Sequence, residues 1–222
     1  MIKKSLRLFL IAFVFALPIS GYILYQSNKL PDKDDITFYL TGKKKSYIEN
    51  LQEQAMSGDT NAMIRLGNNH RHGYNGLQPN NVEAVKWYKL AAKQGDASAQ
   101  YFLGRKYETG RGVTQNYKEA EKWLRLSAEQ GNAEAQVTLG LMHLGESGET
   151  EDCLGETENH KEAVKWFRLS AEQKNADAQC WLGHMYLEGM GVTEDYAEAI
   201  KWWKIAAEQG HERAKYNLEN YA

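Results

Sequence analysis

The dipeptide Lys-Trp recurs four times at a nearly constant interval, and this periodicity restricts the possible folds more than any other feature. The intervals are 36, 43 and 36 residues, for Trp87, Trp123, Trp166 and Trp202. A Leu-Gly pair repeats with matching spacing, at Leu66-Gly67, Leu103-Gly104, Leu139-Gly140 and Leu182-Gly183. Both series contain the same seven-residue excess between Gly140 and Trp166. A period of this length predicts stacked supersecondary units, each packed only on its neighbours.

Each unit is predicted to contain two helices. In the first helix, Ala99, Leu103 and Tyr107 stand four residues apart and therefore share one face. In the second helix, Trp87 and its equivalents lie on an apolar stripe at spacings i, i+3, i+4 and i+7, which predicts that they are buried. The glycine of each Leu-Gly pair costs about 1 kcal/mol inside a helix. We therefore expect two helix backbones to approach closely there.

The predicted helix ends carry their own signals. Asx residues stand three positions before a Glu, as in a capping box, at Asn80, Asn116, Asn159 and Asp195. Gly95-Asp96 and Gly131-Asn132 each supply a left-handed glycine stop followed by a cap for the next helix. Lys174-Asn175 lacks the glycine and Gly210-His211 lacks the usual cap residue, so we expect looser junctions at these two places.

The run from Gly95 to Gly104, with Tyr107, Gly110-Arg111-Gly112-Val113 and Lys122-Trp123, resembles the Sel-1-like repeat family, which is related to the tetratricopeptide repeats. The resemblance covers roughly residues 58–222. It implies an all-α fold, a right-handed superhelical α–α solenoid of helix-turn-helix repeats. It also implies a concave surface, lined by the first helices, that holds a protein or peptide partner.

We predict that the chain consists of three segments. We expect a signal peptide or membrane anchor over 1–28, and a tether with a degenerate capping helix over 29–57. The solenoid follows over 58–222, with repeats 58–94, 95–130, 131–173 and 174–209 and a capping helix over 210–222.

The amino-terminal segment is typical of export. Lys3, Lys4 and Arg7 precede residues 8–28, which carry no charge. If this segment is cleaved, the protein is soluble in the periplasm. If it is kept, residues 8–25 are just long enough to tether the protein to the inner membrane. Both alternatives stay open on the sequence, and in both the membrane is contacted only through this segment.

Catalytic and cofactor motifs are absent from the sequence. It contains no Gly-x-Ser-x-Gly, phosphate-binding loop, dinucleotide fingerprint or zinc-protease helix. His70 and His143 occupy the repeat position of Tyr107, which favours packing over metal binding. A net charge of −2 gives no general reason to bind nucleic acid. We therefore expect no enzymatic activity, cofactor, metal or nucleic acid, and a monomeric chain.

The two cysteines, Cys153 and Cys180, form a candidate disulfide in an oxidising compartment. The alternative is that Cys180 is a small core residue, because it occupies the position of Tyr101. The insertion 144–159 is acidic. It could bind a cation or a basic partner, or it could be a solvated loop.

The predicted partner surface lies where the repeats differ on an otherwise constant scaffold. Three first-helix positions vary in this way: Arg65, Phe102, Thr138 and Trp181; Asn68, Arg105, Leu141 and His184; and Asn69, Lys106, Met142 and Met185. The polar residues among them suggest exposure, and exposed aromatic residues are common interface anchors. The candidate partner-binding residues are Arg65, Asn68, Phe102, Arg105, Trp181, His184 and Met185. Local packing of Phe102 and Trp181 against a neighbouring helix is the alternative.

These observations predict a protein-protein interaction scaffold of the bacterial envelope. A cell-wall-binding or enzymatic module is the first alternative, and it requires ionisable residues that converge in the groove. A specific inhibitor or immunity-type protein is the second, and it differs only in its partner.

Overall fold

The computed structural model describes residues 46–145 and 156–221, and every regular element in these ranges is an α-helix. The predicted all-α solenoid is therefore confirmed. Helix α4 covers Tyr47–Met56. The remaining helices are α5 (Thr60–His72), α6 (Asn81–Lys93), α7 (Ala97–Thr109), α8 (Tyr117–Glu129), α9 (Ala133–His143), α10 (Glu156–Glu172), α11 (Ala176–Glu188), α12 (Tyr196–Glu208) and α13 (Glu212–Tyr221).

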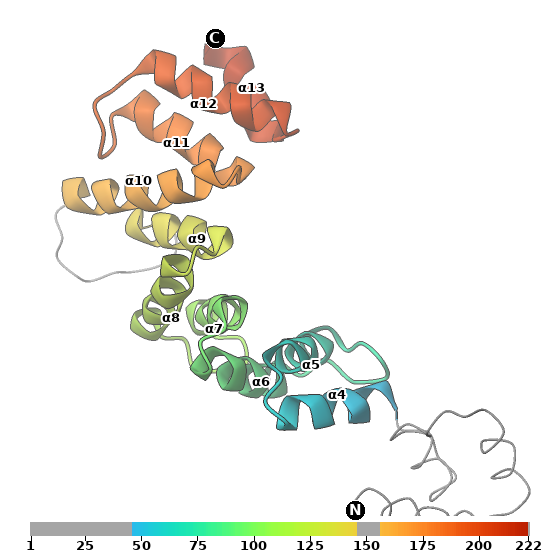
Figure 1. The fold of residues 1–222 in the computed structure, drawn as a ribbon. Helices are drawn as coiled ribbons and strands as arrows, with labels where there is room; N and C mark the ends of the chain where they lie inside the picture. Colours follow the sequence, from blue (N-terminus) through green and yellow to red (C-terminus); the bar gives the residue numbers. More distant parts are fainter. Residues whose placement is uncertain (1–45, 146–155, 222) are drawn as a thin grey trace, which may run out of the picture. The chain divides into compact units, whose positions relative to one another are not determined.

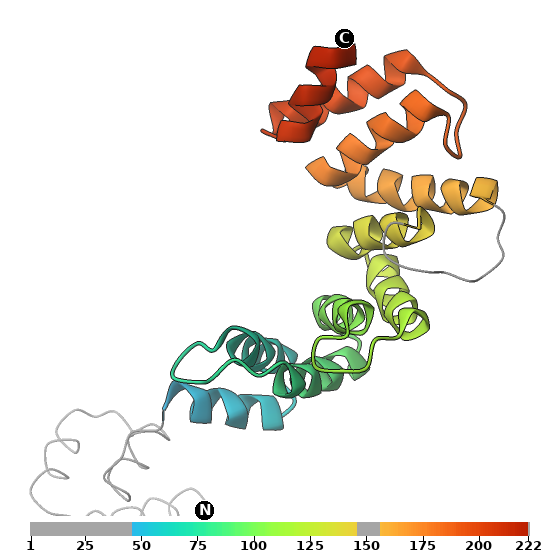
Figure 2. The same ribbon diagram turned by 180° about the vertical axis from the view of Figure 1, so that it is seen from behind.

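The chain divides into two compact units, Met1–Asn50 and Leu51–Ala222. In the first unit only residues 46–50 are described, and they hold a capping box in which Ser46 and Glu49 exchange hydrogen bonds between side chain and backbone. The second unit contains the repeats. From α5 to α13 each helix packs on the next one in the chain (Figures 1 and 2). This nearest-neighbour packing is what defines a solenoid.

The core is a repeated pair of side chains. The leucine of each Leu-Gly pair is 0 % exposed. Opposite it, also at 0 %, lies the residue that follows the periodic tryptophan: Tyr88, Leu124, Phe167 and Trp203. Of the periodic tryptophans only Trp166 is buried, while Trp87, Trp123 and Trp202 are half-buried. The prediction that all four are core residues is therefore wrong, since the stripe is centred one residue later.

The helical glycines make room for these large side chains. A Cβ on Gly67 would lie 2.4 Å from the Tyr88 ring, and a Cβ on Gly183 would lie 2.3 Å from Trp203 Nε1. Close approach is thus confirmed, but at three of the four glycines its partner is an aromatic ring rather than the backbone that we expected.

Most predicted cap residues are confirmed, but the reciprocal half of the capping box is not, because the backbone amides of Asn80, Asn116 and Asp195 donate to carbonyls of the preceding helix and not to the Glu side chains. Asn80, Asn116 and Asp195 accept hydrogen bonds from the backbone amides of Glu83, Glu119 and Glu198. Asn159 is the exception, because α10 begins at Glu156 and Asn159 lies inside it.

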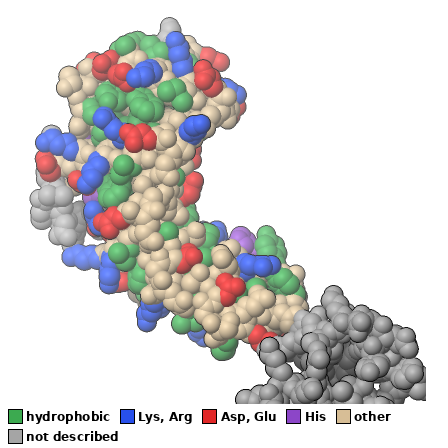
Figure 3. Space-filling model, in the orientation of Figure 1, with side chains coloured by type: hydrophobic (Ala, Val, Ile, Leu, Met, Phe, Trp, Pro, Cys, Tyr) green, Lys and Arg blue, Asp and Glu red, His purple; other side chains and the backbone are tan. Residues whose placement is uncertain are grey.

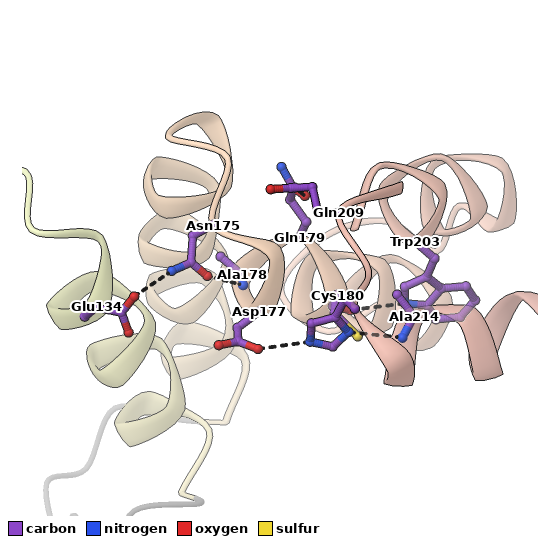
Figure 4. A network of polar contacts seen from close by, with 10 residues as sticks. Glu134, Asn175, Asp177, Ala178, Gln179, Cys180, Trp203, Gln209 and Ala214 are labelled. Atoms are coloured by element: carbon purple, nitrogen blue, oxygen red, sulfur yellow. Dashed lines mark hydrogen bonds and ion pairs between the residues drawn. The ribbon is translucent and has the colours of Figure 1, made fainter. Parts of the chain in front are cut away.

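At the two junctions predicted to be loose, other residues take the place of the missing glycine and the missing cap. Lys174 takes the left-handed conformation itself, with φ of 67°, and Asn175 still caps Ala178. His211 Nδ1 accepts from the Ala214 amide, and His211 Nε2 lies 2.9 Å from Asp177 Oδ1. Both capping hydrogen bonds are therefore present (Figure 4).

A row of buried glutamines, absent from the sequence prediction, joins successive repeats. Gln100, Gln136 and Gln179 each donate to a carbonyl eight residues earlier, at the end of the preceding helix. Their side-chain oxygens accept from glutamines of the next repeat junction: Gln130, Gln173 and Gln209. The row satisfies buried polar groups and fixes how adjacent repeats are placed.

Candidate functional site

The three variable first-helix positions differ in exposure, and only two of them reach the surface. At the first, Arg65 is exposed, Phe102 and Trp181 are half-buried and Thr138 is buried. At the second, all four residues are partly exposed: Asn68, Arg105, Leu141 and His184. These two positions form the first-helix face, and six of the seven candidate residues lie on it.

The third position is core in every repeat. Met185 is 0 % exposed and packs in an apolar cluster with Phe167 and Leu182, so its assignment to the partner surface is corrected. Asn69 and Lys106 are each 6 % exposed. Each has a hydrogen-bond partner inside the protein: Asn69 bonds to Arg65 O and Asn75, and Lys106 Nζ donates one hydrogen bond to Asn81 Oδ1. A polar side chain here therefore does not indicate exposure.

On α5 and α7, polar groups surround an aromatic pair. Phe102 stacks on Tyr88, with ring centroids 5.1 Å apart. The Tyr88 hydroxyl donates to Asn68 Oδ1 at 2.8 Å. Burial raises the pKa of Tyr88 to about 12, and the nearby Arg71 opposes this rise. The structure thus brings Asn68 and Phe102 together around Tyr88.

Arg105 stands on the same face, next to a buried acid. Arg105 Nη1 lies 2.8 Å from Glu108 Oε2, and the Arg105 side chain stays 43 % exposed. Burial raises the pKa of Glu108, whereas Arg105 lowers it. The guanidinium is therefore fixed at one edge by Glu108 while its remaining donors stay available at the surface.

On α11, the ring of Trp181 is in contact with another aromatic ring and with an arginine. Trp181 stacks on Phe167 at 5.8 Å with an interplanar angle of 6°, and Arg213 from α13 lies 4.7 Å from the Trp181 ring centroid. His184 meets Trp181 edge-on at 5.9 Å. Local packing and partial exposure therefore coexist at Phe102 and Trp181, since each stacks on the second helix of the preceding repeat. Arg213 is a contributor that the sequence reasoning missed.

Figure 3 shows hydrophobic side chains gathered over the carboxy-terminal helices, with Lys, Arg, Asp and Glu among them. The exposed apolar residues of this part include Tyr196 at 48 %, Tyr216 at 63 % and Tyr221 at 44 %. Helices α12 and α13 therefore present three exposed tyrosines.

Other candidate residues have structural surroundings. Cys180 is a free thiol, 4 % exposed, and its carbonyl accepts from Trp203 Nε1 at 3.1 Å (Figure 4). Burial raises the pKa of this thiol to about 11. Cys153 lies outside the described residues, as does most of the acidic insertion. The predicted disulfide is therefore not shown, and the environment of Cys180 is that of a core residue.

Two further observations concern metals and membranes. Within residues 46–145 and 156–221, no cluster of three or more His, Cys, Asp or Glu side chains could hold a metal ion. His143 is half-buried in the place of Tyr107, and burial lowers its pKa. No helix in these ranges is both long and apolar enough to cross a bilayer. Residues 8–25, the predicted anchor, lie outside them.

Comparisons with known proteins agree with this architecture. The model of the Sel1 repeat matches residues 60–96, 97–132, 133–175 and 176–211. The crystal structure of a Sel1 repeat protein from Oxalobacter formigenes is similar with a TM-score of 0.68 and 31% identity, over 83% of this chain and 73% of that one. That of c5321, a protective antigen of uropathogenic Escherichia coli with an SLR fold, gives a TM-score of 0.67 and 38% identity, over 75% of this chain and 34% of that one.

A plant protein is also similar over a shorter stretch. It is the ERAD-associated E3 ubiquitin-protein ligase component HRD3A of Arabidopsis thaliana, 30% identical over 71 residues, which is 32% of this chain and 10% of that protein. The chain thus spans only a tenth of this relative and a third of c5321. Sel1 repeats generally mediate protein-protein interactions and typically form non-enzymatic scaffolds. With four matched repeats over most of its length and this solenoid of paired helices, the chain belongs to the Sel1 repeat family.

Proposed function

We propose that this protein is an interaction scaffold of the bacterial envelope, which binds a protein or peptide partner on the first-helix face. The observation that carries the proposal is the contrast within the repeats. Their leucines, glycines and caps are nearly constant, whereas the partly exposed residues of the first-helix face change from one repeat to the next. Constant residues maintain the scaffold, and variable exposed ones are available for recognition.

The chemistry of this face suits a folded or extended polypeptide. Asn68 and Arg105 offer hydrogen-bonding groups, and Phe102 and Trp181 offer flat apolar area already fixed by stacking. Aromatic residues and arginine are the side chains that most often dominate interface energies. Because both aromatic rings are held by Tyr88 and Phe167, little side-chain entropy is lost when a partner covers them.

The location in the envelope rests on the sequence of residues 1–28, whose basic start and uncharged segment are typical of export. We propose that this segment precedes a tether and capping helix over 29–57 and a solenoid over 58–222. Comparing the mass of the mature protein with that of the full chain, together with its release from membranes by high salt, would distinguish cleavage from retention.

A binding experiment tests the first-helix face. Single variants Phe102→Ala, Arg105→Ala and Trp181→Ala would be crosslinked to partners in intact cells and the captured species identified by mass spectrometry. Loss of a hot-spot residue weakens binding by about 2 kcal/mol or more, so capture of the main partner should fall at least about tenfold.

The matched control is Leu126→Ala. Leu126 is a comparable exposed apolar residue, 40 % exposed, but it stands on a second helix. All variants should first show wild-type helicity, because Phe102 and Trp181 also stack on core residues. If the three first-helix variants capture the partner as well as Leu126→Ala does, the partner does not bind on this face.

A further inference from the structure

Three cationic residues stand on segments that meet where the first and second repeats join: Arg71, Lys106 and Arg111, and the charges of both arginines act on Lys106. Lys106 is 6 % exposed, whereas Arg71 and Arg111 are exposed. None of the three has a salt bridge with an acidic residue in the described part of the chain. A buried ammonium without a negative partner is unusual, because removing a charge from water costs several kcal/mol that an opposite charge normally offsets.

Local backbone structure holds this cluster together. Gly112 has φ of +87°, and a Cβ on it would lie 2.4 Å from Asn81 O. The turn that carries Arg111 is therefore seated directly on the start of α6. On the other side, the Asn80 amide donates to His70 O, which brings the end of α5, with Arg71, to the same place. Lys106 reaches this point from α7 and donates to Asn81 Oδ1.

The electrostatics of the cluster favour binding of an anion. Burial, and then the charges of Arg71 and Arg111, lower the pKa of Lys106 to about 8, and no carboxylate opposes this shift. Asn81 satisfies one of the three N–H donors of Lys106. The first turn of α6 adds the positive end of its helix dipole, and the one carboxylate in that turn, Glu83, is paired with Lys86. An oxyanion placed between the three side chains would accept their remaining donors and neutralise part of their charge.

We propose that Arg71, Lys106 and Arg111 form a binding site for an oxyanion, a carboxylate or phosphate group. The proposed function supplies only the source of this group, which would be a terminus, acidic side chain or phosphoryl group of the partner. The site itself is a property of the free protein. It can therefore be tested without the partner, and its failure would leave the first-helix face to be judged by capture alone.

The fourth repeat provides an internal reference for this site. The equivalents of Lys106 and Arg111 are Met185 and Met190, which pack in the apolar cluster of that repeat. Gly191 sits on His160 C and O as Gly112 sits on Asn81 O, so the backbone arrangement is shared. The cationic side chains are therefore not required by this turn, and methionine is a compatible replacement at both positions.

The test uses the full chain and two free anions. Sodium phosphate and sodium acetate would be titrated at pH 7 against sodium chloride of equal ionic strength, with the ¹³Cε resonance of Lys106 as the reporter. The spectrum of Lys106→Met assigns that resonance. Lys204→Met is the matched charge control, because Lys204 is exposed and lies on α12.

We expect one or both anions to bind with saturation and to raise the pKa of Lys106. Affinity should fall at least about tenfold in Arg111→Met, and should stay within about twofold in Lys204→Met. Preference for phosphate or for acetate identifies the source of the group. Arg111 is exposed, so its variant remains informative even if Lys106→Met is unstable. Absence of saturable binding of both anions, or equal affinities in Arg111→Met and Lys204→Met, would overturn the proposal.

Discussion

The junction between repeats 1 and 2 and the junction between repeats 3 and 4 share one backbone design but differ in chemistry. In both, a glycine turn of the later repeat rests on the amino-terminal part of a second helix of the earlier one, at Asn81, the first residue of α6, and at His160, the fifth residue of α10. Around the first contact stand Lys106 and Arg111, and around the second stand Met185 and Met190. The scaffold therefore requires the glycine and the helix start, while the side chains next to them are free to acquire a charge.

The same contrast extends to the first-helix face. The amino-terminal half presents Arg65, Asn68 and Arg105 beside a tyrosine-phenylalanine stack. The carboxy-terminal half presents Trp181 between Phe167 and Arg213. A partner that spans the array would thus meet hydrogen-bonding groups and positive charge at one end, and mainly aromatic area at the other.

The largest expected effect comes from exchanging the residues of the two junctions. Met185→Lys would bury an ammonium in an apolar cluster and should lower the free energy of unfolding by about 3–5 kcal/mol. The reverse change, Lys106→Met, should stay within about 1 kcal/mol of wild type, because removal of a buried charge offsets the lost bond to Asn81. Chemical denaturation followed by circular dichroism measures both.

This pair of exchanges tests whether the interiors of the two junctions differ. If both variants lose similar amounts of stability, the interiors of the two junctions are equivalent. The first junction then accommodates a buried charge no better than the second. The denaturation slope should be compared as well, since loss of one repeat alone would reduce it.

A smaller effect is expected from the helical glycines. In Gly183→Ala the new methyl group meets the fully buried indole of Trp203, which is also held by its bond to Cys180 O. We expect a loss of about 2 kcal/mol after the helix-propensity gain of about 1 kcal/mol. In Gly104→Ala the nearest atoms are Leu124 Cγ at 2.7 Å and the backbone Ala120 O at 3.2 Å, and the leucine is smaller than the indole, so the loss should be nearer about 1 kcal/mol.

Thermal unfolding of both alanine variants measures this difference. Ser98→Ala, an exposed change on α7, serves as the control and should stay within about 0.5 kcal/mol. A Gly183→Ala protein as stable as wild type would mean that Trp203 has room to move, which contradicts its packing.

The fold was largely predictable because its signals are local. A cap such as Asn80 and the glycine that ends a helix act within four residues, and the leucines repeat in four copies. The third variable position was misassigned for the opposite reason. Lys106 is buried and donates a hydrogen bond to Asn81, 25 residues away. A rule that interprets polar side chains as exposed cannot detect such a tertiary partner. Asn159 failed as a cap because helix α10 begins three residues earlier.

The candidate site was predictable only in part. Disagreement between repeats located Phe102, Arg105 and Trp181 on one face, and burial then removed Met185. Arg71 and Arg213 were missed because they lie at a helix end and on the terminal helix, outside the compared positions. A search for lysines and arginines that replace apolar repeat residues would have found Lys106, since Met142 and Met185 stand in its place.

The smallest expected effect is a pH dependence confined to the first junction. The pKa of Lys106 is lowered to about 8 in the folded protein, below its ordinary value of 10.5. Between these values the unfolded chain binds more protons than the folded one, so stability should rise as the pH increases through 8 toward 10. After burial, the charges of Arg71 and Arg111 are the causes of this lowered pKa. Above pH 10 ionisation of tyrosines in the unfolded chain acts in the opposite direction, because burial raises the pKa of Tyr88 to about 12 in the folded state.

Unfolding measured from pH 7.5 to 9.0 in wild type and Lys106→Met isolates this contribution, because the two proteins share every other titrating group. The stability of wild type relative to the variant should increase by about 1 kcal/mol across this range. Saturating phosphate, if it binds as proposed, should abolish the increase, because a bound anion keeps Lys106 protonated. Parallel pH curves for the two proteins without phosphate would mean that the Lys106 ammonium is solvated as fully as an ordinary surface lysine, and the two junctions would then differ in composition but not in electrostatic environment.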